Sequence, residues 1–303
     1  MKTYPKITIV TQCFNRQETI SDTIESILSQ GYPNLEYIVI DDSSMDKSWD
    51  IIQKYKGKVT YMERLGGQRK NPIYALNYGF SKATGDILTW INAKNILMPR
   101  SLFTIAEVFT SFKEIEWVTG MGTTIDGQGK IVYVGGSNYD FYDYLSPRGS
   151  AVIQQESTFF TRSLWEKAGG KFNERYTNAF DVCLWCEHFF PRAKLYHIDT
   201  IIGAYRKSPH SLSIKYGKEF ADFETLARKK MSELVPPKEL FHAKVYRALK
   251  FFRPLLRNIP DDAFSKIPLL KRYSHIHLKF RTIENDSGVL MKYLKNPFRH
   301  FDR

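Results

Sequence analysis

Residues 6–44 decide the fold, and they read KITIVTQCFNRQETISDTIESILSQGYPNLEYIVIDDSS. Two runs rich in Ile and Val, at 6–11 and 35–40, predict buried strands. Between them, residues 18–30 carry apolar side chains at helical spacing, and Gly31 marks the end of that helix. A strand, a helix and a second strand in this order predict a parallel sheet with helices on both faces.

The alternation of strands and helices continues along the first half of the chain. Further helices are expected at 46–55, 72–83 and 99–113, and further strands at 59–63, 86–91, 117–121 and 130–134. In parallel sheets, ligands bind beyond the carboxyl ends of the strands. This rule places the predicted site in three loops: 11–16, 41–46 and 92–95. A polar, aromatic stretch at 135–151 reads as a loop, and 164–168 and 181–189 read as helices.

Composition is that of an ordinary globular protein, with 43% apolar and 25% charged residues among 303. No apolar run approaches the roughly 18 residues that a membrane span requires. Three cysteines are too few for a disulfide framework, so we expect a protein of the reducing cytoplasm. The CxxC pair Cys183 and Cys186 falls inside a predicted helix, which favours packing over redox chemistry.

The net charge of +12 is concentrated in the tail. Residues 238–303 hold 15 Lys and Arg against six Asp and Glu, a net charge of +9. From residue 218 the pattern is mostly helical, so we expect a first domain at 1–215 and a basic helical extension at 216–303. Apolar residues at helical spacing from Phe241 onward fit an anionic membrane surface, or packing against the first domain or another subunit. No nucleic-acid motif accompanies the charge, so nucleic acid is not an expected partner.

Carboxylates follow the second strand, as Asp41 and Asp42. Capping of the next helix explains part of this acidic turn. Two adjacent carboxylates exceed what one cap needs, and one of them is suited to accept the N–H of a uracil ring.

Several ordered segments resemble glycosyltransferase family 2, the inverting GT-A enzymes, over residues 6–213. The segments are ITIVTQCFNR (7–16), LEYIVIDDSSMDKS (35–48), ALNYGFSKATGDILTWINAKN (75–95), QQESTFFTRSLWEKAGG (154–170) and AFDVCLWCE (179–187). The resemblance implies a GT-A fold, a Rossmann-like α/β fold that binds nucleotide-sugars, here followed by a C-terminal helical extension.

The resemblance also implies roles for individual residues. Asp181 would be the catalytic base. The nucleotide side would comprise Thr11, Asn15, Arg16, Asp41, Asp42, Asn92 and Lys94. The sugar or acceptor side would comprise Gln155, Glu156 and Trp185.

Inverting transfer needs one carboxylate to take the proton of the acceptor hydroxyl as it attacks the anomeric carbon. The leaving diphosphate needs cationic stabilisation, and no covalent enzyme intermediate is involved. The alternative interpretation of Asp181 is a helix N-cap.

The metal motif of the family is altered in this chain. After the fourth strand the sequence reads Asn92-Ala93-Lys94-Asn95, with Lys94 where the main metal-ligating Asp is common. Mg²⁺ and Mn²⁺ prefer carboxylate oxygens. A +1 and a +2 charge about 4 Å apart repel by roughly 8 kcal/mol at an effective dielectric of 20. No metal ligand is therefore assigned. A Mg²⁺ or Mn²⁺ cofactor stays an open alternative that Lys94 disfavours.

Other residues near the predicted site have two interpretations each. Lys94 itself, with Arg69 and Lys70, would bind the diphosphate or form a solvated loop. His197 and His210 read as surface or core histidines in preference to metal ligands.

We therefore expect an inverting transferase that moves a sugar from a nucleotide-sugar, UDP-sugar being favoured, to a glycan or lipid-linked acceptor. By analogy with the family, surface polysaccharide synthesis is the expected setting. The tail would bring the protein to the inner face of a membrane. The alternative is a catalytically inactive pseudo-glycosyltransferase, retaining nucleotide binding or acting as a scaffold.

Overall fold

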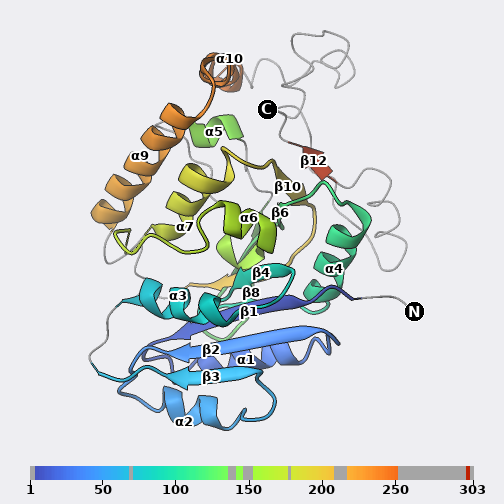
Figure 1. The fold of residues 1–303 in the computed structure, drawn as a ribbon, viewed down its shortest axis with the longest axis vertical. Helices are drawn as coiled ribbons and strands as arrows, with labels where there is room; N and C mark the ends of the chain where they lie inside the picture. Colours follow the sequence, from blue (N-terminus) through green and yellow to red (C-terminus); the bar gives the residue numbers. More distant parts are fainter. Residues whose placement is uncertain are drawn as a thin grey trace.

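The computed structural model describes residues 4–67, 71–135, 141–145, 153–176, 179–207, 217–251 and 298–300. Its centre is an eight-stranded sheet in the order β12-β10-β6-β9-β4-β1-β2-β3 (Figure 1). The strands are β1 (Ile7–Cys13), β2 (Leu35–Asp41), β3 (Tyr61–Arg64), β4 (Ile87–Trp90), β6 (Trp117–Thr119), β9 (Thr158–Thr161), β10 (Leu195–Ile198) and β12 (Phe298–His300). β1 pairs in parallel with β2 and β4, and β2 with β3, so the predicted parallel sheet is confirmed for these four strands. The whole sheet is mixed, because β9 is antiparallel to β4 and β6 and β12 is antiparallel to β10.

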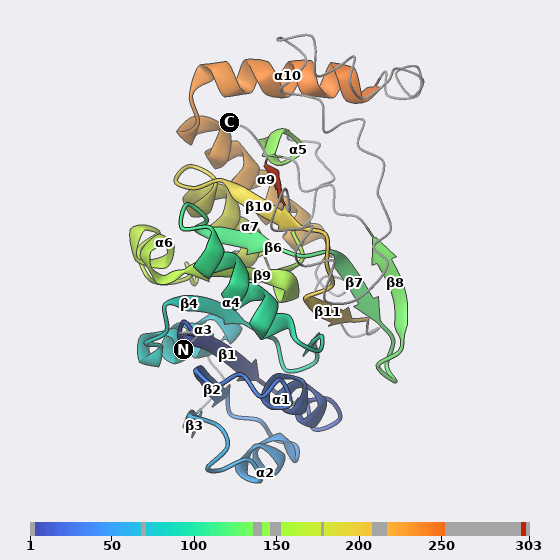
Figure 2. The same ribbon diagram turned by 90° about the vertical axis from the view of Figure 1, so that its right-hand side faces the viewer.

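A second, four-stranded sheet lies beyond the carboxyl end of β4. Its order is β5-β11-β7-β8, formed by β5 (Ile96–Leu97), β11 (Gly203–Arg206), β7 (Gly122–Ile125) and β8 (Ile131–Gly135). The hairpin β7–β8 stands at the edge of the molecule (Figure 2), and the strand predicted at 130–134 is confirmed as its second arm. The first arm is Gly122–Ile125, whereas the strand predicted at 117–121 ends at Thr119 and belongs to the large sheet.

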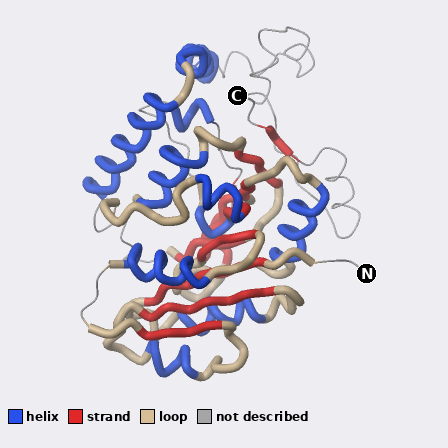
Figure 3. Tube along the Cα trace, in the orientation of Figure 1, coloured by secondary structure: helices blue, strands red, loops and turns tan. Residues whose placement is uncertain are grey.

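Helices cover both faces of the large sheet (Figure 3). They are α1 (Ile20–Leu28), α2 (Ser48–Gln53), α3 (Pro72–Lys82), α4 (Ser101–Ser111), α5 (Phe141–Leu145), α6 (Arg162–Lys167), α7 (Phe180–Cys183), α9 (Gly217–Leu234) and α10 (Pro237–Phe251). A 3-10 turn η1 (Gln155–Ser157) precedes β9, and a π-helix η2 (Leu184–Phe189) continues α7. Within the described residues, no helix is long and apolar enough to cross a membrane.

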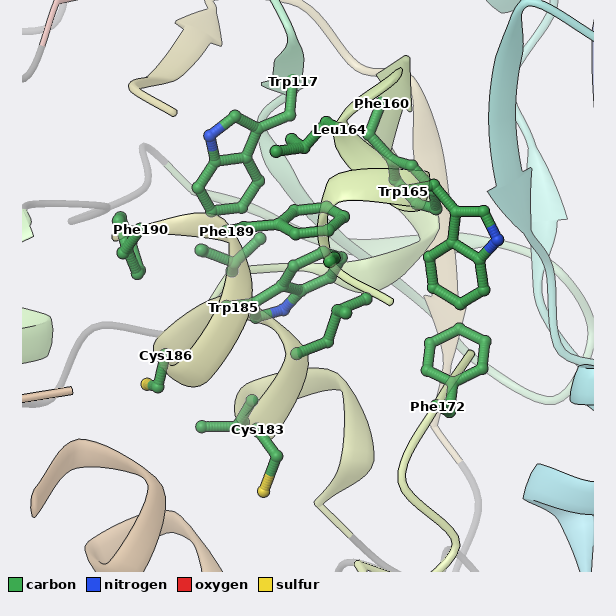
Figure 4. Close-up of a cluster of buried hydrophobic side chains, with 14 of the residues drawn as sticks. Trp117, Phe160, Leu164, Trp165, Phe172, Cys183, Trp185, Cys186, Phe189 and Phe190 are labelled. Atoms are coloured by element: carbon green, nitrogen blue, oxygen red, sulfur yellow. The ribbon is translucent and has the colours of Figure 1, made fainter. Parts of the chain in front are cut away.

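Two hydrophobic cores form because successive side chains of a strand point to opposite faces. Val10 and Ile38 belong to the core under α3, α6 and α7, whereas Ile9 and Val39 belong to the core under α1 and α4. The first core is rich in aromatic rings, which Figure 4 shows clustered around η2.

The stretch predicted as a loop at 135–151 contains the helix α5, whose rings belong to the first core. Phe141, Tyr142 and Tyr144 are almost completely buried, and Tyr144 packs against Phe190. Their burial indicates that these aromatic side chains pack in the core.

Helices α9 and α10 pack onto the same core as the large sheet. Ala227 and Met231 of α9 are completely buried, and Tyr246 of α10 packs against Tyr142. Figure 1 shows α9 beside α7, with α10 at the end of the molecule opposite α2. The predicted boundary at residue 215 lies outside the described residues, and the helices after it share the core of the domain before it.

Candidate active site

The loops after β1 and β2 are joined by hydrogen bonds, as expected for neighbouring parallel strands. The Asn15 side-chain oxygen accepts from the amide of Met45 at 2.8 Å, and the Asn15 amide donates to the Ser44 hydroxyl at 2.9 Å. The amide of Arg16 donates to the Ser48 hydroxyl at 2.7 Å. Asn15 has a φ of 50°, in the left-handed region that Asn adopts more readily than most residues. Asn15 and Arg16 therefore shape the floor of the predicted nucleotide site.

Asp41 ends β2 with a fully buried carboxylate. Its Oδ2 accepts from the Ser44 amide at 2.9 Å and lies 3.5 Å from Nε of Arg64. Its Oδ1 has no hydrogen-bond partner among the described residues. Burial raises the pKa of this carboxyl, and the Ser44 bonds and Arg64 oppose the rise. An unpaired buried acceptor is costly, so Oδ1 is suited to accept from a ligand. Asp42 is also buried.

A chain of amides connects the end of β1 with the end of β4 and with η1. Nε2 of Gln12 donates to Oδ1 of Asn92, and Nδ2 of Asn92 donates to Oε1 of Gln155, both at 3.4 Å. Nε2 of Gln155 in turn donates to the carbonyl of Trp90. The structure thus brings together Asn92 and Gln155, which the sequence placed on the two sides of one site.

Glu156 lies in η1 and is buried, with Oε1 accepting from Nδ2 of Asn95. Burial raises the pKa of Glu156 to about 7, while Lys94 lowers it and Asp181 raises it. β11 passes directly over this turn. A Cβ at Gly203 would lie 2.1 Å from the Glu156 carbonyl oxygen, so only glycine permits this approach.

Asp181 lies in the first turn of α7, and its Oδ1 accepts from the amide of Val182 at 2.9 Å. Burial raises its pKa to about 6, and Glu224 of α9 adds to the rise. The charge of Asp181 also contributes to the raised pKa values of Glu156 and Tyr144, where burial is the main cause. The N-cap of α7 is Ala179, so the alternative interpretation of Asp181 as that cap is wrong. The π-helix that follows is a feature often found at functional sites.

Lys94 extends its ammonium over the ring of Tyr205 in β11. Nζ lies 4.2 Å from the ring centre and 3.2 Å from the hydroxyl oxygen. The next residue of β11, Arg206, donates from Nε to the Lys94 carbonyl at 2.9 Å and from its amide to Oδ1 of Asn95 at 3.0 Å. Both the backbone and the side chain of Lys94 are therefore held by β11.

Two predicted site residues have a different environment from the one expected. The predicted sugar-side role of Trp185 is wrong, because its ring is completely buried and packs against Trp90. It also packs against Trp117 and Phe189 (Figure 4). A ring enclosed by other rings has no face for a sugar. The hydroxyl of Thr11 is buried against the Tyr37 hydroxyl at 3.0 Å, so a contact between Thr11 and the nucleoside stays a prediction.

The predicted core histidine and the two cysteines of the CxxC pair are buried. His197 is buried in β10, with Nδ1 3.2 Å from Asp199, as a core histidine would be. Cys183 and Cys186 are free and buried (Figure 4), as a packing role requires. Arg69, Lys70 and His210 lie outside the described residues.

Sequence reasoning missed Gln12, Asn95, Tyr205 and Arg206 as parts of the site. Gln12 and Asn95 lie inside the predicted loops, and their amides were the available signal. Tyr205 and Arg206 lie in β11, a short strand whose partners are far away in the sequence. No local pattern reveals such a partnership.

Comparison with known proteins finds that the first part of the chain is similar to glycosyltransferases. The model described as glycosyl transferase family 2 matches residues 8–132. The chain is 28% identical over 135 residues to the uncharacterized glycosyltransferase alr2836 of Nostoc, covering 42% of this chain and 39% of that protein. It is 29% identical over 114 residues to the poly-beta-1,6-N-acetyl-D-glucosamine synthase of Staphylococcus epidermidis, covering 38% of this chain and 28% of that protein. The aligned regions span at most about two fifths of these curated relatives.

The fold is similar to that of solved glycosyltransferases. The crystal structure of S. aureus TarS 1–349 in complex with UDP-GlcNAc matches with a TM-score of 0.55 at 14% identity, covering 90% of this chain and 88% of that one. At this identity the likeness concerns the fold alone, and the fold it confirms is the predicted GT-A fold. Residues 8–132 are therefore similar in sequence to glycosyltransferase family 2, and the chain has the fold of solved glycosyltransferases.

Proposed function

We propose that this protein is an inverting glycosyltransferase that uses a nucleotide-sugar, with UDP-sugar favoured. The observation that carries the proposal is the unpaired Oδ1 of the buried Asp41, at the carboxyl end of β2 where a parallel sheet binds its ligand. The N–H of a uracil ring supplies the missing donor. The structural neighbour TarS was solved in complex with UDP-GlcNAc, which supports the same class of donor here.

Asp181 is the proposed general base. The acceptor hydroxyl oxygen forms a bond to the anomeric carbon while the bond from that carbon to the diphosphate oxygen breaks. The bonding electrons leave with the nucleoside diphosphate, and the hydroxyl proton passes to the Asp181 carboxylate. The raised pKa of about 6 suits this task, since a base works best when its pKa is near the working pH. Gln155 and Glu156 line the sugar or acceptor side.

The proposed acceptor is a glycan or a lipid-linked glycan of a surface polysaccharide. The support is the relative from Staphylococcus epidermidis, a poly-beta-1,6-N-acetyl-D-glucosamine synthase. The fold by itself does not choose an acceptor, because unrelated chemistries share folds.

A peripheral association with the inner face of an anionic membrane is also proposed. In α10 the side chain of Phe241 is 63% exposed, and the exposed Lys238 and Lys244 are near it on the helix. An exposed aromatic ring with cations around it suits the boundary of an anionic bilayer. Val245 of the same predicted apolar stripe instead packs partly against the core, so the stripe serves both alternatives.

The test of function is a titration followed by a turnover assay. Purified full-length protein is titrated with UDP and with GDP by calorimetry, and UDP-sugar hydrolysis is then measured with and without acceptor glycans. Binding of UDP with slow hydrolysis supports the proposal. Binding without any turnover on any donor identifies the pseudoenzyme, whose supporting observation is the lysine in the metal motif.

A further inference from the structure

We propose that the ammonium of Lys94, held by Tyr205, takes the place of the divalent cation at the diphosphate, so that nucleotide binding by this protein is independent of metal. This inference rests on the proposed function, because it assigns the cation that faces the leaving group. Two observations support it: Lys94 lies against Tyr205, and the neighbouring side-chain oxygens already accept hydrogen bonds within the protein.

The residues at the metal motif do not fit a divalent cation. Mg²⁺ and Mn²⁺ need several oxygen ligands, with carboxylates preferred. Oδ1 of Asn92 already accepts from Gln12, and Oδ1 of Asn95 accepts from the amide of Arg206. Glu156 is the carboxylate next to them, and it accepts from Nδ2 of Asn95. No group of three or more His, Cys, Asp or Glu in the described part of the chain has the arrangement of a metal site.

An ammonium fits this position where a metal does not. Lys94 lies between β4 and β5, beyond the carboxyl end of the parallel sheet, and influences Glu156 electrostatically. Lysine binds phosphate as a compact point charge with three donors. A diphosphate leaving from this edge of the sheet meets a fixed positive charge, which is what its developing negative charge requires.

Tyr205 is the proposed positioning residue for this charge. A lysine side chain is flexible, and ordering it on ligand binding reduces affinity. The Tyr205 ring face and hydroxyl hold Nζ at 4.2 Å and 3.2 Å, while Arg206 holds the Lys94 carbonyl from the same strand. The strand β11 therefore presents the ammonium in one orientation before the nucleotide arrives.

The first experiment compares calorimetric titrations of UDP and GDP into the full-length protein in EDTA and in Mn²⁺. Equal affinity in both buffers, falling as salt is added, is the expected result. Lys94→Ala should weaken binding in EDTA by about 10- to 100-fold, the loss of one charge-assisted contact. Lys94→Asp should weaken binding in EDTA and recover part of it with Mn²⁺. Lys130→Ala, an exposed lysine of the β7–β8 hairpin, is the matched control and should bind normally.

A double-mutant cycle then tests the positioning role. Tyr205→Phe keeps the ring and loses the hydroxyl contact, so it should weaken binding less than Tyr205→Leu. In the Lys94→Ala background, Tyr205→Leu should cause no further loss, because the ring then has no ammonium to hold. A purely structural role of Tyr205 would give the same loss in both backgrounds and would overturn this part of the proposal.

The two proposals fail in distinguishable ways. Tight binding that requires Mn²⁺ and is abolished by EDTA overturns the inference and leaves the proposed transferase intact. No binding of UDP or GDP in either buffer overturns both the inference and the proposed function.

Discussion

The guanidinium of Arg206 lies 2.8 Å from the carboxylate of Asp22, which joins β11 to the helix α1 although 184 residues separate them in sequence. Asp22 lies inside the region that matches the family and Arg206 lies outside it. The same buried guanidinium donates to the carbonyls of Lys94 and Gly127, at 2.9 Å and 2.8 Å. One side chain therefore fixes the loop of the metal motif and the tip of the hairpin to the first helix.

Replacing Arg206 should lower the free energy of unfolding much more than replacing its ionic partner Asp22. Arg206→Ala removes a buried guanidinium and its hydrogen bonds to the Lys94 and Gly127 carbonyls, and we expect it to lower the free energy of unfolding by about 2–4 kcal/mol. The matched change Asp22→Asn should cost about 1 kcal/mol or less, because the Asp22 side chain is 56% exposed. Urea unfolding of both variants measures the difference. Equal losses would mean that the ion pair, and not the carbonyl bonds, carries the stabilisation.

Asp181→Asn should bind UDP normally and lose sugar transfer by several orders of magnitude, because an amide does not accept the acceptor proton. Glu166→Gln, a change at an exposed carboxylate on α6, is the control. Near-normal turnover of Asp181→Asn would remove Asp181 from the mechanism.

The stability of Asp181→Asn separates a catalytic from a structural role. The pKa of Asp181 rises from 3.8 to about 6 on folding, so the folded state binds its proton more tightly than the unfolded state. Stability supplied by the protonated form is therefore lost as pH rises from about 4 to 6, a loss of up to about 3 kcal/mol. At pH 8 the neutral Asn should leave the protein at least as stable as the unaltered one. A variant unfolded at pH 8 would show that the carboxylate serves the fold.

The same pKa predicts how the rate depends on pH. A general base acts when ionised, so transfer should rise with pH through about 6 and then level off. Glu224 raises the pKa of Asp181, and Glu156 is a second carboxyl near it. Glu224→Gln removes one raising charge and should move the rise to lower pH. If the pH dependence of the transfer rate is the same in Glu224→Gln, Asp181 is not the group whose ionisation controls the rate.

Local pattern and family resemblance predicted the half of the site made by consecutive β-α units, and they did so for a physical reason. The loops at 11–16, 41–46 and 92–95 follow buried strands, whose β-branched runs are visible in sequence and whose ends meet at one edge. Short strands such as β9 and β11 could not be found in this way, because their register depends on partners that are distant in the sequence. Phe160 of β9 pairs with Leu88, and Arg206 of β11 pairs with Ile125. The prediction for Trp185 was wrong for a related reason. An aromatic residue beside a candidate catalytic residue looks the same in sequence whether its ring faces a ligand or the core.

Asp41→Ala should weaken UDP binding by about 1–3 kcal/mol, the cost of losing a buried hydrogen-bond partner. Asp41→Asn keeps the shape of the turn, and it should also weaken UDP binding, because its amide group presents one acceptor where the carboxylate presents two. Asp50→Ala, at an exposed carboxylate on α2, is the control. Calorimetric titration measures all three. Unchanged affinity in both Asp41 variants would limit this carboxylate to the turn that it forms with Ser44 and Arg64.

The tail contains two parts that truncation should separate. Tyr246 and Ala243 of α10 are buried, and Tyr246 packs against Tyr142 with ring centres 5.8 Å apart. A chain ending at residue 235 loses these contacts and exposes Tyr142, so its denaturation midpoint should fall. A chain ending at residue 251 keeps α10 and loses only the edge strand β12, which pairs with β10, so its midpoint should fall less.

The second truncation removes the charge of the last segment, together with β12, while keeping α10. Residues 252–303 hold 11 Lys and Arg against five Asp and Glu, a net charge of +6. Each basic residue near an anionic surface contributes about 1 kcal/mol to binding, so the chain ending at 251 should sediment less with phosphatidylglycerol vesicles than the full-length protein. Phosphatidylcholine vesicles should bind neither, because they lack the anionic charge. If both chains bind anionic vesicles equally, the membrane contact belongs to α10, and Phe241→Ser should then abolish it. If the full-length protein binds neither kind of vesicle, the +6 segment has another partner and the peripheral membrane proposal is wrong.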